Sequence, residues 1–104
     1  MIKLKKIRLT FKERVTESIK IKKGENTLKY PRFNNELKRA VLSKFKKNCQ
    51  YNFNESDDQY IFLFKTKEVR VSIENNWLLV REYRRMGDVT ASNYNHEYLL
   101  DIVD

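Results

Sequence analysis

The chain has one cysteine, one proline, one histidine and two glycines among its 104 residues. With Cys49 alone, it can form no intramolecular disulfide and no multi-cysteine metal site, so a reducing, cytoplasmic compartment is the simplest expectation. Cys49 lacks a basic partner in the sequence and is expected in the core, not as a nucleophile. His96 is the only imidazole, so a Ser, His and Asp triad has little support, and we expect a surface histidine.

Long hydrophobic runs are also missing. No stretch approaches 18 apolar residues, and lysines interrupt the N-terminal residues 1–11, so we expect neither a membrane span nor a signal peptide. Apolar residues nevertheless make up 40% of the chain and include six Phe, six Tyr and Trp77. This composition predicts one small soluble domain over residues 1–104 with a single modest core.

Charge divides the chain into three parts. Residues 1–50 hold sixteen of the 22 Lys and Arg against four acids, a net charge of +12. Residues 51–85 are neutral, and residues 86–104 hold four acids without any Lys or Arg. Clustered Lys and Arg favour a polyanionic partner, because contact with phosphates releases condensed counterions. We therefore expect the partner to be nucleic acid or an acidic protein or ribonucleoprotein surface, and no membrane.

Apolar periodicity predicts an α+β fold with an antiparallel sheet. A strand with a bulge is expected over residues 2–12, paired as a hairpin with residues 17–22. After Pro31, Asn34 or Asn35 can cap a main helix that runs to about residue 47. The continuous apolar run 60–64 is typical of a central strand buried on both faces.

Residues 69–73 and 77–84 complete a three-strand meander through residues 51–85. Asn75 and Asn76 can form the two-residue turn, which places Arg70 opposite Arg81. In the acidic segment 86–104, apolar residues at helical spacing after Ser92 predict a short C-terminal helix.

The pair Arg70 and Arg81 is the sharpest feature of this register, because like charges directly opposite on neighbouring strands are unfavourable by about 0.2–1 kcal/mol. Tyr83 and Trp77 share their face, so two guanidinium groups beside aromatic rings could hold a phosphate and stack a base. Alternatively, Glu68, diagonal to Arg81, neutralises the pair and Trp77 belongs partly to the core.

Two further basic surfaces are candidate sites for nucleic acid or a protein partner. The main helix carries Arg39, Lys46 and Lys47 on one face with Lys44 at its edge, although Lys46 and Lys47 could simply complement the helix dipole. The expected N-terminal hairpin carries six lysines, which could equally protect an exposed edge strand: Lys3, Lys5, Lys6, Lys20, Lys22 and Lys23.

Catalysis and metal binding have weaker support. Residues 54–58 offer oxygen ligands but lack the glycine and the later glutamate of a calcium loop, so we expect a solvated acidic loop. A nuclease could combine Asp57, Asp58 and Glu68 with Lys65 or Lys67 around magnesium, and an RNA-cleaving toxin is a further alternative. No cofactor and no catalytic residue is assigned.

From residue 34 onward the expected order of helix, three strands and helix resembles a double-stranded-RNA-binding domain. That family's second helix opens with lysines, whereas residues 92–104 contain none, so the chain is assigned to no family. We expect a non-enzymatic module that binds nucleic acid mainly through phosphates. The alternative is a small phage or mobile-element inhibitor of a host nucleic-acid enzyme or ribonucleoprotein, similar to an anti-CRISPR protein. The richness in Asn and Lys, typical of AT-rich codons, is compatible with such a source.

Overall fold

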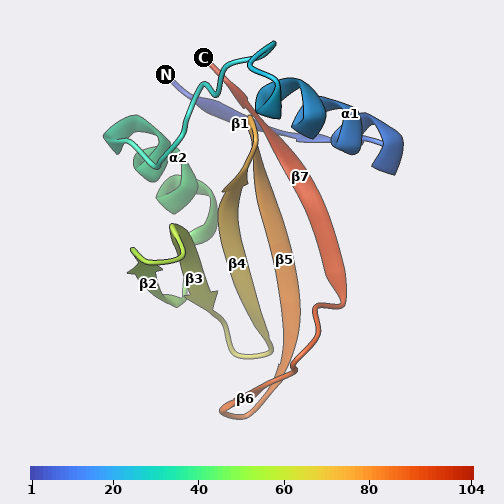
Figure 1. Cartoon of the computed structure of the whole chain (residues 1–104). Helices are drawn as coiled ribbons and strands as arrows, with labels where there is room; N and C mark the ends of the chain where they lie inside the picture. Colours follow the sequence, from blue (N-terminus) through green and yellow to red (C-terminus); the bar gives the residue numbers. More distant parts are fainter.

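Two helices precede most of the strands in the computed structural model, which describes all of residues 1–104 (Figure 1). The elements follow in the order β1 (Lys3–Ile7), α1 (Phe11–Lys22), α2 (Asn35–Phe45), β2 (Gln50–Asn54), β3 (Gln59–Leu63), β4 (Lys67–Glu74), β5 (Trp77–Met86), β6 (Val89–Thr90) and β7 (His96–Val103). This α+β architecture with an antiparallel sheet agrees with the sequence prediction, whereas the detailed placement of helices and strands differs from it.

One antiparallel sheet connects all seven strands. Its order is β1-β7-β5-β4-β3-β2, and β6 pairs with β5 beside this path. The last strand, β7, lies between the first strand and β5, so both chain termini lie at the same end of the molecule (Figure 1). The N-terminal and C-terminal segments are therefore parts of one sheet and not independent appendages.

The core lies between α2 and one face of the sheet. Asn34 caps α2 by accepting a hydrogen bond of 2.8 Å from the Leu37 amide, and the helix buries Leu37, Val41 and Phe45 at a spacing of four residues. This confirms the predicted main helix, which ends at Phe45. The sheet contributes alternate side chains of four strands to the same cluster: Tyr60, Phe62, Val69, Val71, Leu78, Val80, Leu100 and Ile102.

Helix α1 corrects the predicted N-terminal hairpin. Residues 17–22, predicted as a strand, form the second half of α1, and β1 pairs with β7 instead. Thr10 accepts a hydrogen bond of 3.1 Å from the Glu13 amide and caps the helix. A Thr followed three residues later by Glu is a helix-start signature, and local capping therefore outweighs the alternation of Ile19 and Ile21 with lysines.

Helix α1 lies on the sheet face opposite α2 and contacts it through polar side chains. Arg14 donates hydrogen bonds to Glu74 and Glu97, and Ser18 accepts one from Asn75. Apolar side chains of α1 are partly exposed: Phe11 is 81% exposed, and Val15 and Ile19 are also exposed. Polar pairs therefore link this helix to the sheet.

The meander confirms the predicted turn and register. Asn75 adopts a φ of 53°, and Glu74 faces Trp77, Ile73 faces Leu78, Val71 faces Val80 and Arg70 faces Arg81. The expectation that residues 60–64 form the central strand is wrong. β3 lies next to the edge strand β2, and only its alternate residues Tyr60 and Phe62 are buried.

The predicted C-terminal helix is also wrong, because residues 96–103 form strand β7. Tyr98, Leu100 and Ile102 alternate toward the α2 side and pack in or against the core. The segment offers apolar residues at both helical and strand spacing. Two flanking strands, β1 and β5, supply backbone hydrogen bonds that favour the extended form.

Candidate nucleic-acid interface

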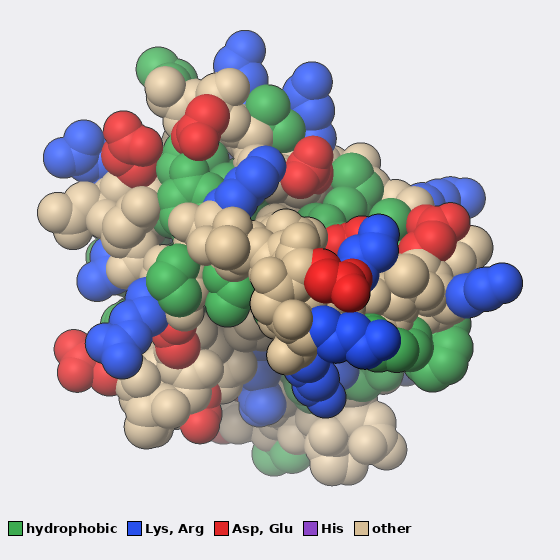
Figure 2. Space-filling model, turned by 45° about the horizontal axis from the view of Figure 1, so that its top comes forward, with side chains coloured by type: hydrophobic (Ala, Val, Ile, Leu, Met, Phe, Trp, Pro, Cys, Tyr) green, Lys and Arg blue, Asp and Glu red, His purple; other side chains and the backbone are tan.

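The fold mixes charges that are segregated along the sequence. Strand β7 carries Glu97 and Asp101 between basic neighbours: Glu97 binds Arg14 and Arg81, and Asp101 lies opposite Lys5. In Figure 2, basic and acidic side chains are intermixed over the visible face. The acidic segment is thus built into the sheet and does not form a tail that could cover a basic face.

Most basic side chains still have no carboxylate partner. Only Arg14, Lys20, Arg70 and Arg81 form ion pairs, so 18 of the 22 Lys and Arg side chains are unpaired. The unpaired majority determines where a polyanion would gain most, because its phosphates would not have to displace a protein carboxylate.

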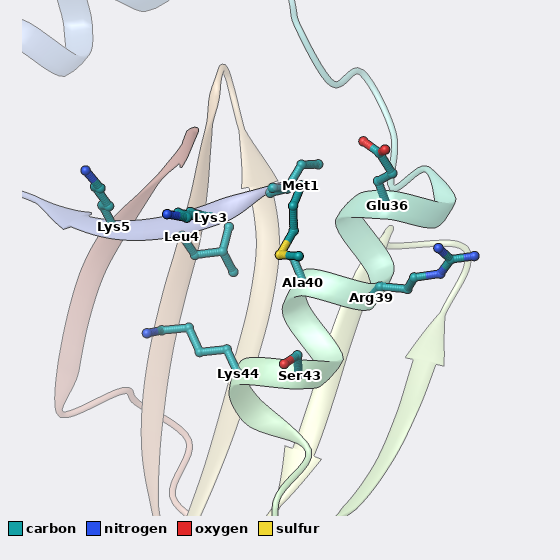
Figure 3. A pocket seen from close by; sticks show the side chains of 10 residues that line it. Met1, Lys3, Leu4, Lys5, Glu36, Arg39, Ala40, Ser43 and Lys44 are labelled. Carbon is teal, nitrogen blue, oxygen red and sulfur yellow. The ribbon is translucent and has the colours of Figure 1, made fainter. Parts of the chain in front are cut away.

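A groove of about 750 Å³ lies between β1 and α2 (Figure 3). Four predicted site residues from two distant segments line it, namely Lys3, Lys5, Arg39 and Lys44. Figure 3 shows Lys44 extending toward β1, whereas Lys5 and Arg39 point outward at opposite ends. The structure therefore brings N-terminal lysines next to the basic helix. The sequence had predicted these as two separate basic surfaces.

The groove combines a positive rim with apolar lining. None of its four Lys and Arg side chains forms an ion pair, and Glu36 is the only acid among the lining residues. Ile2, Leu4 and Ala40 supply apolar atoms between the charges. Such a surface can attract phosphates and also contact sugars or apolar side chains.

The other flank of α2 carries a second basic strip, next to aromatic rings of β2. The ammonium group of Lys46 lies 5.0 Å from the Tyr51 ring centre, and that of Lys38 lies 5.0 Å from the Phe53 ring centre. Lys47 is exposed beside them. Sequence reasoning missed β2 and therefore Tyr51 and Phe53, although their alternation with Asn52 was a strand signal.

Arg70 and Arg81 lie opposite each other on the sheet face away from α2, as predicted. Each is neutralised by a carboxylate: Arg70 Nε donates to Glu68, and Arg81 Nε donates to Glu97 over 2.8 Å. The alternative that Glu68 neutralises the pair therefore holds for Arg70, on its own strand, whereas Glu97 neutralises Arg81. The contact between Arg81 and Glu97 raises the pKa of the guanidinium.

Aromatic rings hold both guanidinium groups from one side. That of Arg70 lies 4.3 Å from the Tyr83 ring centre, and that of Arg81 lies 4.7 Å from the Tyr94 ring centre. Tyr94 was not among the predicted site residues, since its segment was assigned to a helix. Trp77, predicted on the same face, faces Asp101 and lines a separate polar groove beneath α1.

The remaining predicted site residues lie elsewhere. Lys6 lies over the Tyr98 ring at 4.8 Å, and Lys20 pairs with Glu17 at 3.6 Å within α1. Lys22 and Lys23 are exposed at the end of the same helix. The predicted set is thus divided among the groove and flanks of α2, the arginine pair behind the sheet, and α1.

The structure does not bring together the side chains considered for metal binding or catalysis. No group of three or more His, Cys, Asp or Glu side chains is placed to hold a metal ion, so Asp57, Asp58 and Glu68 do not form the cluster considered for a nuclease. His96 is exposed. Burial raises the pKa of the Cys49 thiol, and Cys49 packs against the core, as expected.

Comparisons with protein-family models, with curated proteins and with solved structures found no match for this chain. Neither helix is long and apolar enough to cross a membrane.

Proposed function

We propose that this protein is a non-enzymatic module that binds nucleic acid mainly through phosphates, with the groove between β1 and α2 as the centre of the interface. The observation that carries the proposal is that Lys3, Lys5, Arg39 and Lys44 border one groove and that none of them forms an ion pair. Each phosphate contact there would release counterions without first breaking an ion pair in the protein.

The flanks of α2 extend this surface. Lys46 and Lys47 continue the positive charge past the end of the helix, where they also complement the negative end of its dipole. The Tyr51 ring is 40% exposed, with Phe62 stacked against it at 5.9 Å and Lys46 over it, so a base could stack there only by displacing the Lys46 ammonium. A phosphate backbone following α2 would therefore meet cations along its length and an aromatic ring at one end.

Fluorescence anisotropy of labelled single- and double-stranded RNA and DNA tests this proposal. The double variant Lys5→Glu/Lys44→Glu reverses two charges at the groove. The matched control Lys22→Glu/Lys23→Glu makes the same change in net charge at the exposed end of α1. We expect micromolar or tighter binding at physiological salt, a strong loss in the groove variant and a small loss in the control. Equal losses would reduce the effect to net charge and would contradict the proposal.

A protein partner is the second candidate, and one observation favours it. β1 is an edge strand that pairs only with β7, so its other edge leaves backbone donors and acceptors free along the groove. An extended acidic peptide could add there as a further strand, with its carboxylates near Lys3 and Lys44 and apolar side chains near Leu4. Such a mode would suit an inhibitor of another protein, as the sequence alternative supposed.

The two candidates differ in what binds and in how salt affects it. A protein partner predicts tight one-to-one binding to one protein and negligible affinity for free nucleic acid. If no RNA or DNA binds at physiological salt, affinity capture with the wild-type protein and the groove variant becomes the deciding measurement. A protein retained by the wild type and lost by the groove variant would establish the second candidate.

A further inference from the structure

The arginine pair behind the sheet is bound by the protein on only one side of each guanidinium group. In both Arg70 and Arg81, the hydrogen bond to a carboxylate uses Nε. The terminal Nη nitrogens of both side chains make no hydrogen bond within the protein. Each arginine is about two-fifths exposed, so these donors remain open to a ligand.

The orientation of the open donors is fixed before any ligand arrives. Tyr83, itself buried, lies under Arg70, and Tyr94 lies beside Arg81. The two rings also contact each other edge to face at 6.3 Å. A guanidinium group held by a carboxylate at Nε and by a ring against its plane loses little further freedom on binding, and this preorganisation favours recognition.

We propose that Arg70 and Arg81 form a binding site for a single phosphate group, separate from the groove and on the opposite face of the sheet. Two neighbouring guanidinium groups present four terminal nitrogens from two strands. A tetrahedral phosphate can accept hydrogen bonds from both groups at once, whereas one fork already satisfies the two oxygens of a carboxylate.

Local charge supports a site that selects by geometry. Glu68 and Glu97 lie on the Nε side of the arginines and balance their charge, so the pair adds little to the long-range positive field. Binding here would therefore depend on short charge-assisted hydrogen bonds. It would fall less steeply with salt than binding at the unpaired groove, and the two sites can be distinguished on that basis.

The phosphate could come from a free or terminal phosphomonoester or from a phosphodiester of a nucleic-acid chain. NMR spectra of the arginine Nε–H groups, recorded while ligand is added, separate the two sources. The probes are inorganic phosphate, a nucleoside monophosphate, a short oligonucleotide without terminal phosphates, and acetate as the carboxylate control. Saturable shifts with all three phosphorus compounds assign the site to phosphodiesters as well, and shifts with the first two alone assign it to phosphomonoesters.

Variants connect these shifts to the pair. Arg81→Lys keeps the charge but removes the fork, and we expect it to weaken phosphate binding about ten- to hundredfold, as the loss of a charge-assisted hydrogen bond predicts. The control Arg84→Lys makes the same change on β5 at an exposed, unpaired position on the other face. Should Arg81→Lys unfold, Tyr94→Leu removes the exposed ring beside Arg81 and is expected to weaken binding in the same direction.

The groove variant Lys5→Glu/Lys44→Glu should leave phosphate binding at the pair unchanged, so the two proposals can fail separately. If none of the phosphorus compounds causes a saturable shift, the proposed site is wrong. Equal binding of acetate and phosphate, or an equal loss in Arg81→Lys and Arg84→Lys, would overturn it as well.

Discussion

Glu97 accepts a hydrogen bond of 2.8 Å from Nε of Arg81, across the pairing of β7 with β5. The other oxygen of the same carboxylate accepts a hydrogen bond of 3.0 Å from Arg14 of α1. One acid from the C-terminal segment thus joins two strands and a helix. The side chain is only 19% exposed, so these contacts are partly shielded from water.

Glu97→Gln is predicted to destabilise the fold by about 1–3 kcal/mol at neutral pH, because it leaves two arginines without their shared charge partner. Urea denaturation measures this loss. Glu25→Gln, at an exposed position without an ion pair, serves as the matched control and should change little. A loss in Glu97→Gln no larger than that of the control would contradict the role of Glu97.

The same residue predicts a pH dependence. Burial, the largest single influence, raises the pKa of Glu97, but the hydrogen bonds from Arg81 and Arg14 outweigh it and hold the pKa below its ordinary value of 4.5. The stabilisation is therefore complete above the pKa of the unfolded chain and disappears as pH falls through the lower pKa of the folded protein. The difference between wild type and Glu97→Gln should shrink in acid, and a constant difference would contradict this assignment.

Truncation after Asn95 is predicted to prevent folding, because β7 joins β1 to β5 and supplies buried Leu99, Leu100 and Ile102. Circular dichroism and urea titration should show no cooperative transition. A chain lacking only Asp104 loses the hydrogen bond to Tyr30 and should stay folded, which controls for shortening as such. A truncated chain that keeps its β-sheet signal and unfolds cooperatively in urea would contradict this topology.

The two faces of β3 should respond differently to substitution. Phe62→Ala removes a fully buried ring from the core and is predicted to cost about 3–5 kcal/mol of unfolding free energy. Ile61→Ala removes a half-buried side chain from the other face and should cost clearly less. Equal losses in urea denaturation would indicate that β3 is buried on both sides, as its apolar run alone had predicted.

Thr10→Ala is predicted to cost about 1 kcal/mol, because the Glu13 amide loses its acceptor at the start of α1. Thr10→Ser keeps the hydroxyl and should retain most of the stability. Amide exchange within the first turn of α1 measures the effect locally. Unchanged exchange in Thr10→Ala would show that contacts of Arg14 with the sheet, and not the cap, define where the helix begins.

Local signals in the sequence predicted the elements whose partners are close in the chain. The turn at Asn75 and the register of β4 with β5 follow from a two-residue connection, and the spacing of Leu37, Val41 and Phe45 identified α2. The prediction failed at residues 17–22, where the local cap at Thr10 outweighs the alternation, and again where distant pairing decides. Whether residues 96–103 form a helix or a strand depends on β1, almost one hundred residues away in the chain.

The candidate site shows the same division. The opposition of Arg70 and Arg81 was predictable from alternation and turn length, and so was an acid near the pair, Glu68, whereas Glu97 was not. Glu97 reaches Arg81 only because β7 pairs with β5, and Tyr94 approaches through the loop before β7. The groove likewise required β1 to lie beside α2, which no spacing in the sequence specifies.

The salt dependence of nucleic-acid binding by the wild type, Lys5→Glu/Lys44→Glu and Lys22→Glu/Lys23→Glu decides whether the groove is a nucleic-acid interface. We predict a log-linear fall of the affinity with salt. In a plot of log affinity against log salt, the slope of the groove variant should be shallower by roughly 0.9 for each lost contact to duplex phosphate. The α1 control should keep the wild-type slope. Identical slopes and affinities in all three proteins, or no binding at physiological salt, would contradict the groove as a nucleic-acid interface.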